Sequence, residues 1–266
     1  MSDAAHVAIM DGDSVAVYDQ AQRKLTIFDP QLRFVRSAPM PASVFGVVWL
    51  SSRKAFLVNA FVPDRSRIGI PFHLFDRVGN QLGSMGSERP ISGASLPALA
   101  MKVVELPDRT FISVPLVGDV VLERWTIAGQ LVERFARPTN FPMAEFNPTG
   151  MLTTNPFPIQ TAGAWTDPDG MLWVLLWVPD GRWRDGIRQT TSEDGEDHFE
   201  LIDYVKTFDS VLEVTDLRLR RLVASARFDD ALVAAARGGA LYSVRRDEAG
   251  RFALVQQGAR LVNARR

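Results

Sequence analysis

Side chains that could do chemistry are few in this chain and widely spaced. The three histidines, His6, His73 and His198, lie far apart and show no spacing typical of paired metal ligands. The chain has no cysteine, which excludes thiol nucleophiles, disulfides and cysteine-ligated zinc or iron–sulfur sites. It also lacks a Gly-x-Ser-x-Gly nucleophile elbow, a Walker-type phosphate loop and a dinucleotide-binding glycine fingerprint. The motifs therefore predict no catalytic set.

The segment Arg182-Trp183-Arg184 is the most suggestive candidate for ligand binding, because Trp and Arg dominate binding hot spots. The acidic run 193–197 and His198 follow in the same stretch. We interpret Arg182, Trp183 and His198 as candidate ligand-binding residues. The alternative is structural: Trp183 folds over a neighbouring sheet face with the arginines solvated around it, and the acidic run is a solvated loop of like charges.

The elements that would position these residues repeat along the chain. One phrase, a short alternating strand, a polar or glycine-containing turn and a second short strand, recurs at 25–36, 72–84, 122–135 and 212–223. A more apolar pair of strands precedes each hairpin, and its second strand follows a turn signal at 11–13, 51–53, 107–108 or 167–170. Units of four strands that recur roughly every 40–50 residues are typical of β-propeller blades.

The sequence thus predicts an all-β chain, a β-propeller of four-stranded blades. Five units are recognised and a sixth is allowed, with an incomplete N-terminal blade. The last unit has its hairpin at 239–255, and 231–236 is either its innermost strand or a short helical turn. We expect a single domain over 1–266, with loop insertions at about 138–158 and 179–203.

Charge and hydropathy limit the partners. The 30 basic and 31 acidic residues give a formal net charge of -1, which disfavours nucleic-acid binding. The longest apolar run, 171–178, is too short to span a bilayer. The start of the chain shows no basic or apolar region typical of a signal peptide, so a cytoplasmic location is the default expectation.

Three phrases resemble bacterial six-bladed β-propeller proteins of the NHL-like type. They are Gly12–Asp19, Leu25–Pro30 with Arg33–Arg36, and Leu241–Gly250. The resemblance implies six blades, a preceding blade and an export signal. A truncated start or a true five-unit ring would each explain the count found here, and truncation would make the protein exported. An RNA-binding NHL module would need a basic face, which the balanced charge disfavours.

A metal site follows only from analogy with metal-dependent six-bladed lactonases, in which acids and amides converge on one cation. Glu105, Asn147, Asn155 and Asp167 are the loop-adjacent side chains that could do so here. The leading interpretation is a non-enzymatic binding or scaffold module without a cofactor, whose ligand is an unknown protein or small molecule. The alternative is a lactonase-like hydrolase that holds Ca²⁺ or another divalent cation at the channel mouth.

Overall fold

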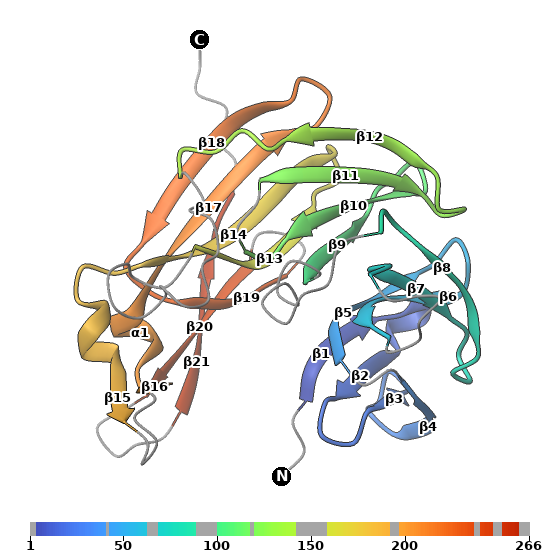
Figure 1. Cartoon of the computed structure of the whole chain (residues 1–266), viewed down its shortest axis with the longest axis horizontal. Coiled ribbons are helices and arrows are strands. Elements are labelled where there is room, and N and C mark those ends of the chain that lie inside the picture. The colour runs from blue at the N-terminus through green and yellow to red at the C-terminus, as the bar shows by residue number, and fades with distance from the viewer. Residues whose placement is uncertain are drawn as a thin grey trace. The chain divides into compact units, whose positions relative to one another are not determined.

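Regular structure in this protein is almost entirely β-strand (Figure 1). The computed structural model describes residues 4–40, 43–62, 69–88, 100–117, 120–141, 159–191, 197–236, 240–246 and 252–260. The helical elements in these ranges are the short turns η1 (Asp11–Asp13), η3 (Trp183–Gly186) and α1 (Tyr204–Thr207). No helix in the same ranges has the length and apolarity needed to cross a bilayer. The prediction of an all-β chain is confirmed.

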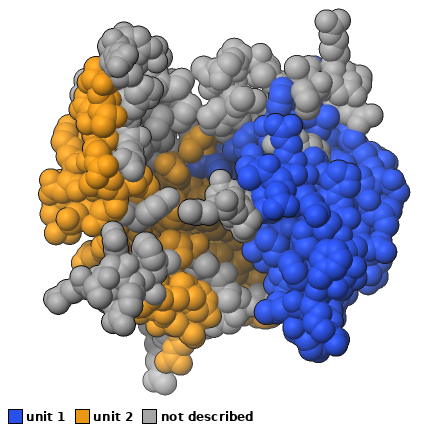
Figure 2. Space-filling view, turned by 90° about the horizontal axis from the view of Figure 1, so that it is seen from below, with its two compact units in different colours: residues 1–116, 121–136 blue, residues 117–120, 137–266 orange. Residues whose placement is uncertain are grey.

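The chain divides into two compact units, which Figure 2 shows in different colours. Unit 1 comprises residues 1–116 and 121–136, and unit 2 comprises 117–120 and 137–266. Unit 1 contains three sheets, and unit 2 contains two sheets and a separate two-stranded hairpin. The interpretation of 1–266 as one domain with two loop insertions stays a prediction.

The three sheets of unit 1 share one topology, an antiparallel meander with its strands in chain order. The first is β1 (Ala4–Ile9), β2 (Val15–Asp19), β3 (Lys24–Phe28) and β4 (Phe34–Pro39). The second is β5 (Ser43–Leu50), β6 (Ala55–Phe61), β7 (Phe72–Phe75) and β8 (Gln81–Met85). The third is β9 (Met101–Glu105), β10 (Thr110–Pro115), β11 (Val121–Thr126) and β12 (Leu131–Ala136). The first strands β1, β5 and β9 lie next to one another in that order.

Unit 2 repeats the pattern with one interruption. Its first sheet is β13 (Gln160–Thr166), β14 (Met171–Pro179), β17 (Phe208–Asp216) and β18 (Arg221–Phe228). Its second sheet is β19 (Leu232–Ala236), β20 (Ala240–Arg246) and β21 (Phe252–Gly258), so that 231–236, which the sequence left open, is mainly strand. The hairpin of β15 (Ile187–Thr191) and β16 (Asp197–Leu201) is inserted between β14 and β17.

Five sheets of one topology, with first strands adjacent within each unit, are the blades of a β-propeller. The predicted fold class is confirmed, and the described residues form five blades, four of them with four strands. We number the blades in chain order, so that the interrupted sheet of unit 2 is blade four.

The repeated phrase owes its shape to one polar side chain at the turn between the third and fourth strands of a blade. In the first blade, Asp29 Oδ1 accepts the backbone N–H groups of Gln31 and Arg33, each at 2.9 Å. Asp76 makes an equivalent pair of bonds in the second blade, and the Thr126 hydroxyl accepts one such bond in the third. A side chain that accepts from the backbone two to four residues ahead favours a tight turn over continued strand. The hairpins recur because this turn chemistry recurs.

The middle strands of each blade supply the core. All the residues of β17 and six of the seven in β6 are buried, because neighbouring strands and sheets cover both faces. The outer strands β4 and β12 are largely exposed and mix polar with apolar residues. Blade four therefore offers a rigid, fully buried strand, β17, directly beside its insertion.

Candidate functional site

The candidate site lies at the base of the insertion in blade four, residues 180–207. β14 and β17 stay paired along their full length, from Met171 opposite Asp216 to Pro179 opposite Phe208. Asp180 N–H donates to the Thr207 carbonyl at 3.0 Å, so the insertion leaves and re-enters the blade at one point. We call this point the neck. The insertion is an addition to the blade and does not take part in its sheet.

Close packing fixes the neck. Trp183 is buried, and the guanidinium carbon of Arg184 lies 4.5 Å from the centroid of its ring. Gly186 allows the chain segments to approach, because a Cβ at this position would lie 2.1 Å from Thr207 Oγ1 and 2.6 Å from the Asp203 carbonyl oxygen. Only glycine fits there without moving the backbone.

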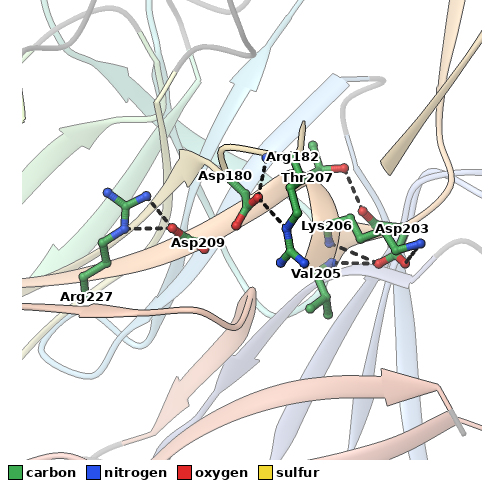
Figure 3. A network of polar contacts seen from close by, with 8 residues as sticks. All are labelled: Asp180, Arg182, Asp203, Val205, Lys206, Thr207, Asp209 and Arg227. Atoms are coloured by element: carbon green, nitrogen blue, oxygen red, sulfur yellow. Dashed lines mark hydrogen bonds and ion pairs between the residues drawn. The ribbon is translucent and has the colours of Figure 1, made fainter. Parts of the chain in front are cut away.

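Asp203 closes the other side of the neck (Figure 3). Its Oδ1 accepts the backbone N–H groups of Val205 and Lys206 at 3.0 and 3.3 Å, which satisfies free donors at the start of α1. Its carbonyl oxygen accepts the Thr207 hydroxyl at 2.7 Å. The chain is thus guided from the hairpin into β17 by local hydrogen bonds.

Four charged side chains form a row across the neck, in the order Arg182, Asp180, Asp209, Arg227 (Figure 3). Arg227 Nε donates to Asp209 Oδ2 at 2.8 Å, and its Nη2 donates to the same oxygen. At the other end, the backbone N–H and Nε of Arg182 donate to Asp180 Oδ1 at 2.5 and 3.3 Å. The carboxyl groups of Asp180 and Asp209 are neighbours in the middle of the row, and each affects the pKa of the other. Two neighbouring carboxyl groups are more stable when they share one proton than when both are ionised.

The two carboxyl groups differ in their surroundings. Burial raises the pKa of Asp209, whose side chain is only 7% exposed. The backbone N–H of Arg182 lowers the pKa of Asp180. Asp209 Oδ1 is buried and accepts no N–H or O–H donor among the described residues. A proton on Asp209 Oδ1 would turn this buried acceptor into a donor that the neighbouring Asp180 carboxylate could accept.

The row links the first residue of the insertion to two strands of the blade. Asp180 begins the insertion, Asp209 lies on β17 and Arg227 lies on β18. The chemistry that this arrangement supports is charge pairing with one exchangeable proton. It holds the neck in place.

The predicted ligand-binding residues fall in two places. Arg182 and Trp183 meet at the neck, where the Arg182 side chain is 69% exposed and paired with Asp180, and Trp183 is buried. His198 lies on β16 opposite Thr190, and its side chain is outside the described residues. The ligand-binding role of Arg182, Trp183 and His198 stays a prediction, and Trp183 contributes to the interior of the neck.

Two of the four predicted metal ligands are described, and each is engaged within its own unit. Glu105 lies in unit 1 and accepts the Ser52 hydroxyl at 3.1 Å. Asp167 lies in unit 2, where its two oxygens accept Met171 N–H at 2.9 Å and Trp173 Nε1 at 2.8 Å. Asn147 and Asn155 lie outside the described residues. In the described ranges, no group of three or more acidic or histidine side chains could hold a metal ion.

Sequence reasoning missed Asp180, Asp203 and Asp209. A signal for Asp209 is present, because it interrupts the strand 208–216, which is otherwise rich in apolar residues. A charged residue in a buried strand requires a partner. Asp180 and Asp203 give no comparable signal, since an aspartate in a loop is ordinary.

Comparison with known proteins supports the fold alone. No known protein family matches the sequence, and no curated protein is similar to it. A member of the DUF4221 family from Bacteroides vulgatus has a TM-score of 0.58 at 9% identity, over 94% of this chain and 76% of that one. A protein from Bacteroides fragilis has 0.52 at 10%, over 91% and 66%. A streptogramin B lyase has 0.50 at 10%, over 97% and 84%. At such identities the chain shares with these proteins the β-propeller fold.

Proposed function

We propose that this protein is a non-enzymatic β-propeller binding module whose contact element is the blade-four insertion. One observation carries the proposal: the insertion is tied to the blade at the neck, yet four of the five residues of β15, Arg188–Thr191, are exposed. A two-stranded hairpin contributes little stability by itself. A hairpin with an exposed strand, held by a closely packed neck, is better suited to contacts than to support of the blade.

The form of the hairpin supports a protein ligand. The sheet of β15 and β16 has two strands among the described residues, so both strands are edge strands. Such an edge can pair with an extended segment of a partner chain. Arg188 and Gln189 add side chains that donate hydrogen bonds to that segment.

Site-specific cross-linking tests the proposal. A photoreactive amino acid is placed at Thr190 on the hairpin and, as a matched control, at Arg36 on the exposed outer strand of the first blade. We expect a partner that cross-links at position 190 and not at position 36. The purified partner is then titrated against wild type, Arg188→Glu and Arg36→Glu, which carry the same charge change at two exposed strands. Loss of at least tenfold in affinity is expected for Arg188→Glu alone.

Two results would contradict the proposal. Equal cross-linking at positions 190 and 36, or partner binding that survives replacement of 187–201 by a short glycine linker, would exclude the hairpin as the contact element. Metal-dependent hydrolysis of lactones or esters by the purified chain would contradict the proposed binding function. It would favour the alternative, a hydrolase that uses Glu105 and Asp167. A screen with Ca²⁺, Zn²⁺ and Mn²⁺ accompanies the assay, because a cation at 100 times its Kd adds about 2.7 kcal/mol of stability.

A further inference from the structure

Two basic side chains lie on the first strands of two blades in unit 1, and both are far from the blade-four insertion in sequence. His6 is on β1 and Lys102 is on β9, and β5 runs between these two strands. β5 and β9 approach closely at Gly46, where a Cβ would lie 3.2 Å from the carbonyl oxygen of Met101, the residue before Lys102. The Lys102 charge is near enough to His6 to oppose its protonation.

Two contacts hold His6 in place. Its Nε2 is hydrogen-bonded to the Val44 carbonyl oxygen on β5 at 3.1 Å, and its ring stacks on Tyr18 with the centroids 6.1 Å apart. Burial lowers the pKa of His6, and the nearby Lys102 adds to the effect. The ring is therefore fixed before any ligand arrives.

Lys102 has no partner among the described residues, unlike two other lysines of the chain. Lys54 pairs with Asp11 at 2.5 Å, and Lys206 pairs with Asp203 at 3.8 Å. Among the described residues, no hydrogen bond or ion pair engages the Lys102 ammonium. Burial lowers the pKa of Lys102. Glu105, three residues further along the strand, projects to the opposite face and accepts the Ser52 hydroxyl. A half-buried cation without a counter-ion is costly, and an anion would relieve that cost.

We propose that Lys102, with His6 beside it, forms a binding site for an anionic group, a carboxylate or a phosphate of a small molecule. The ammonium supplies the charge and up to three donors, and the protonated form of the His6 ring adds a second positive charge once the anion is present. The first strands of blades one to three supply the rigid frame. This site is independent of the insertion and of the partner proposed for it.

Thermal shift measurements with simple anions test the proposal. Inorganic phosphate and acetate are titrated at constant ionic strength against chloride, and the Tm of wild type, Lys102→Met and Lys54→Met is followed. We expect an anion at about 100 times its Kd to raise the Tm of wild type and Lys54→Met by roughly 5 °C. Lys102→Met keeps the apolar stem and loses the charge, so its Tm should follow only the general salt effect.

Acetylation of the four lysines provides a second readout that needs no variant. With a soluble acetylating reagent, mass spectrometry gives the rate at Lys102 relative to Lys54 in the same sample. We expect phosphate or acetate to slow acetylation of Lys102 at least tenfold and to leave Lys54 unchanged. Protection by phosphate alone identifies a phosphoryl ligand, and protection by acetate identifies a carboxylate. Unchanged Lys102 acetylation with both anions, or an equal Tm rise in Lys102→Met, would overturn the proposal.

Discussion

The Asp180–Asp209 pair couples the neck of the insertion to pH. For Asp209, burial raises the folded-state pKa, so its contribution to stability is present below the unfolded value of about 3.9 and is lost as the pH rises through the folded pKa. For Asp180, the Arg182 N–H lowers the folded-state pKa, so its contribution is present above the unfolded value and is lost as the pH falls through the folded pKa. The neck is most stable with one proton on the pair.

Asparagine substitutions separate the two roles. In Asp209→Asn the amide can donate to Asp180 without a bound proton, so we expect its stability relative to wild type to increase between about pH 4.5 and about pH 8. Asp180→Asn should cost about 1 kcal/mol at neutral pH, because charge-assisted bonds from Arg182 become neutral ones. Denaturant unfolding across this pH range measures both effects. Parallel pH profiles for wild type and Asp209→Asn would contradict the shared proton.

Sequence reasoning is least informative at such contacts. Asp180 and Asp209 are brought together by the return of the chain through Thr207, and no local pattern encodes that return. Lys102 and His6 are likewise on different blades, and their proximity follows from the stacking of β1, β5 and β9. Segments with local chemistry fared better: the hairpins 25–36 and 72–84 were predicted, and in the structure Asp29 and Asp76 form their turns by bonding the backbone nearby.

Strands and turns can be predicted from the hydrophobic periodicity of the sequence and from its turn-forming residues. The apolar run 171–178 is the buried β14, and the four hairpin phrases are the third and fourth strands of four blades. These could be predicted because alternation and turn residues act within a few positions. The hairpin β15–β16 could not be predicted, because β15 is polar and largely exposed, so no hydrophobic period marks it.

The insertion should behave as an element separate from its blade, which two glycines test. A Cβ at Gly186 would meet Thr207 and Asp203 atoms at 2.1 and 2.6 Å, whereas a Cβ at Gly181 meets nothing within 4 Å. Gly186→Ala should strain the neck by about 1–3 kcal/mol and raise proteolytic cleavage within 187–203 about tenfold, with little change in Tm. Gly181→Ala is the control and should match wild type.

A large fall in the Tm of Gly186→Ala would show that the insertion supports the blade. The same outcome would weaken the hairpin as a free contact element, because the sheet would then depend on it. Equal proteolysis of the two variants would instead show that the neck tolerates the added methyl group.

The charge of the whole molecule is balanced at the level of individual pairs. Several arginines are matched to nearby acids, as Arg33 is to Asp29 and Arg124 is to Asp108 and Glu133. With 30 basic and 31 acidic residues, the chain carries no net positive charge to attract a polyanion. The Lys102 site differs, since it needs only one unpaired cation in a partly desolvated place.

The chain should therefore distinguish small anions from nucleic acids. Fluorescence anisotropy of a labelled DNA duplex and a labelled single-stranded RNA should stay unchanged up to about 100 µM protein at about 100 mM salt, where nonspecific binders have Kd values of about 1–100 µM. Binding that weakens steeply with added salt would reveal a basic face and favour an RNA-binding propeller. On a basic face, a single lysine accounts for only one released counter-ion, so its loss would weaken nucleic-acid binding without abolishing it. If Lys102→Met abolished the binding, the nucleic acid phosphates would instead be occupying the small-anion site.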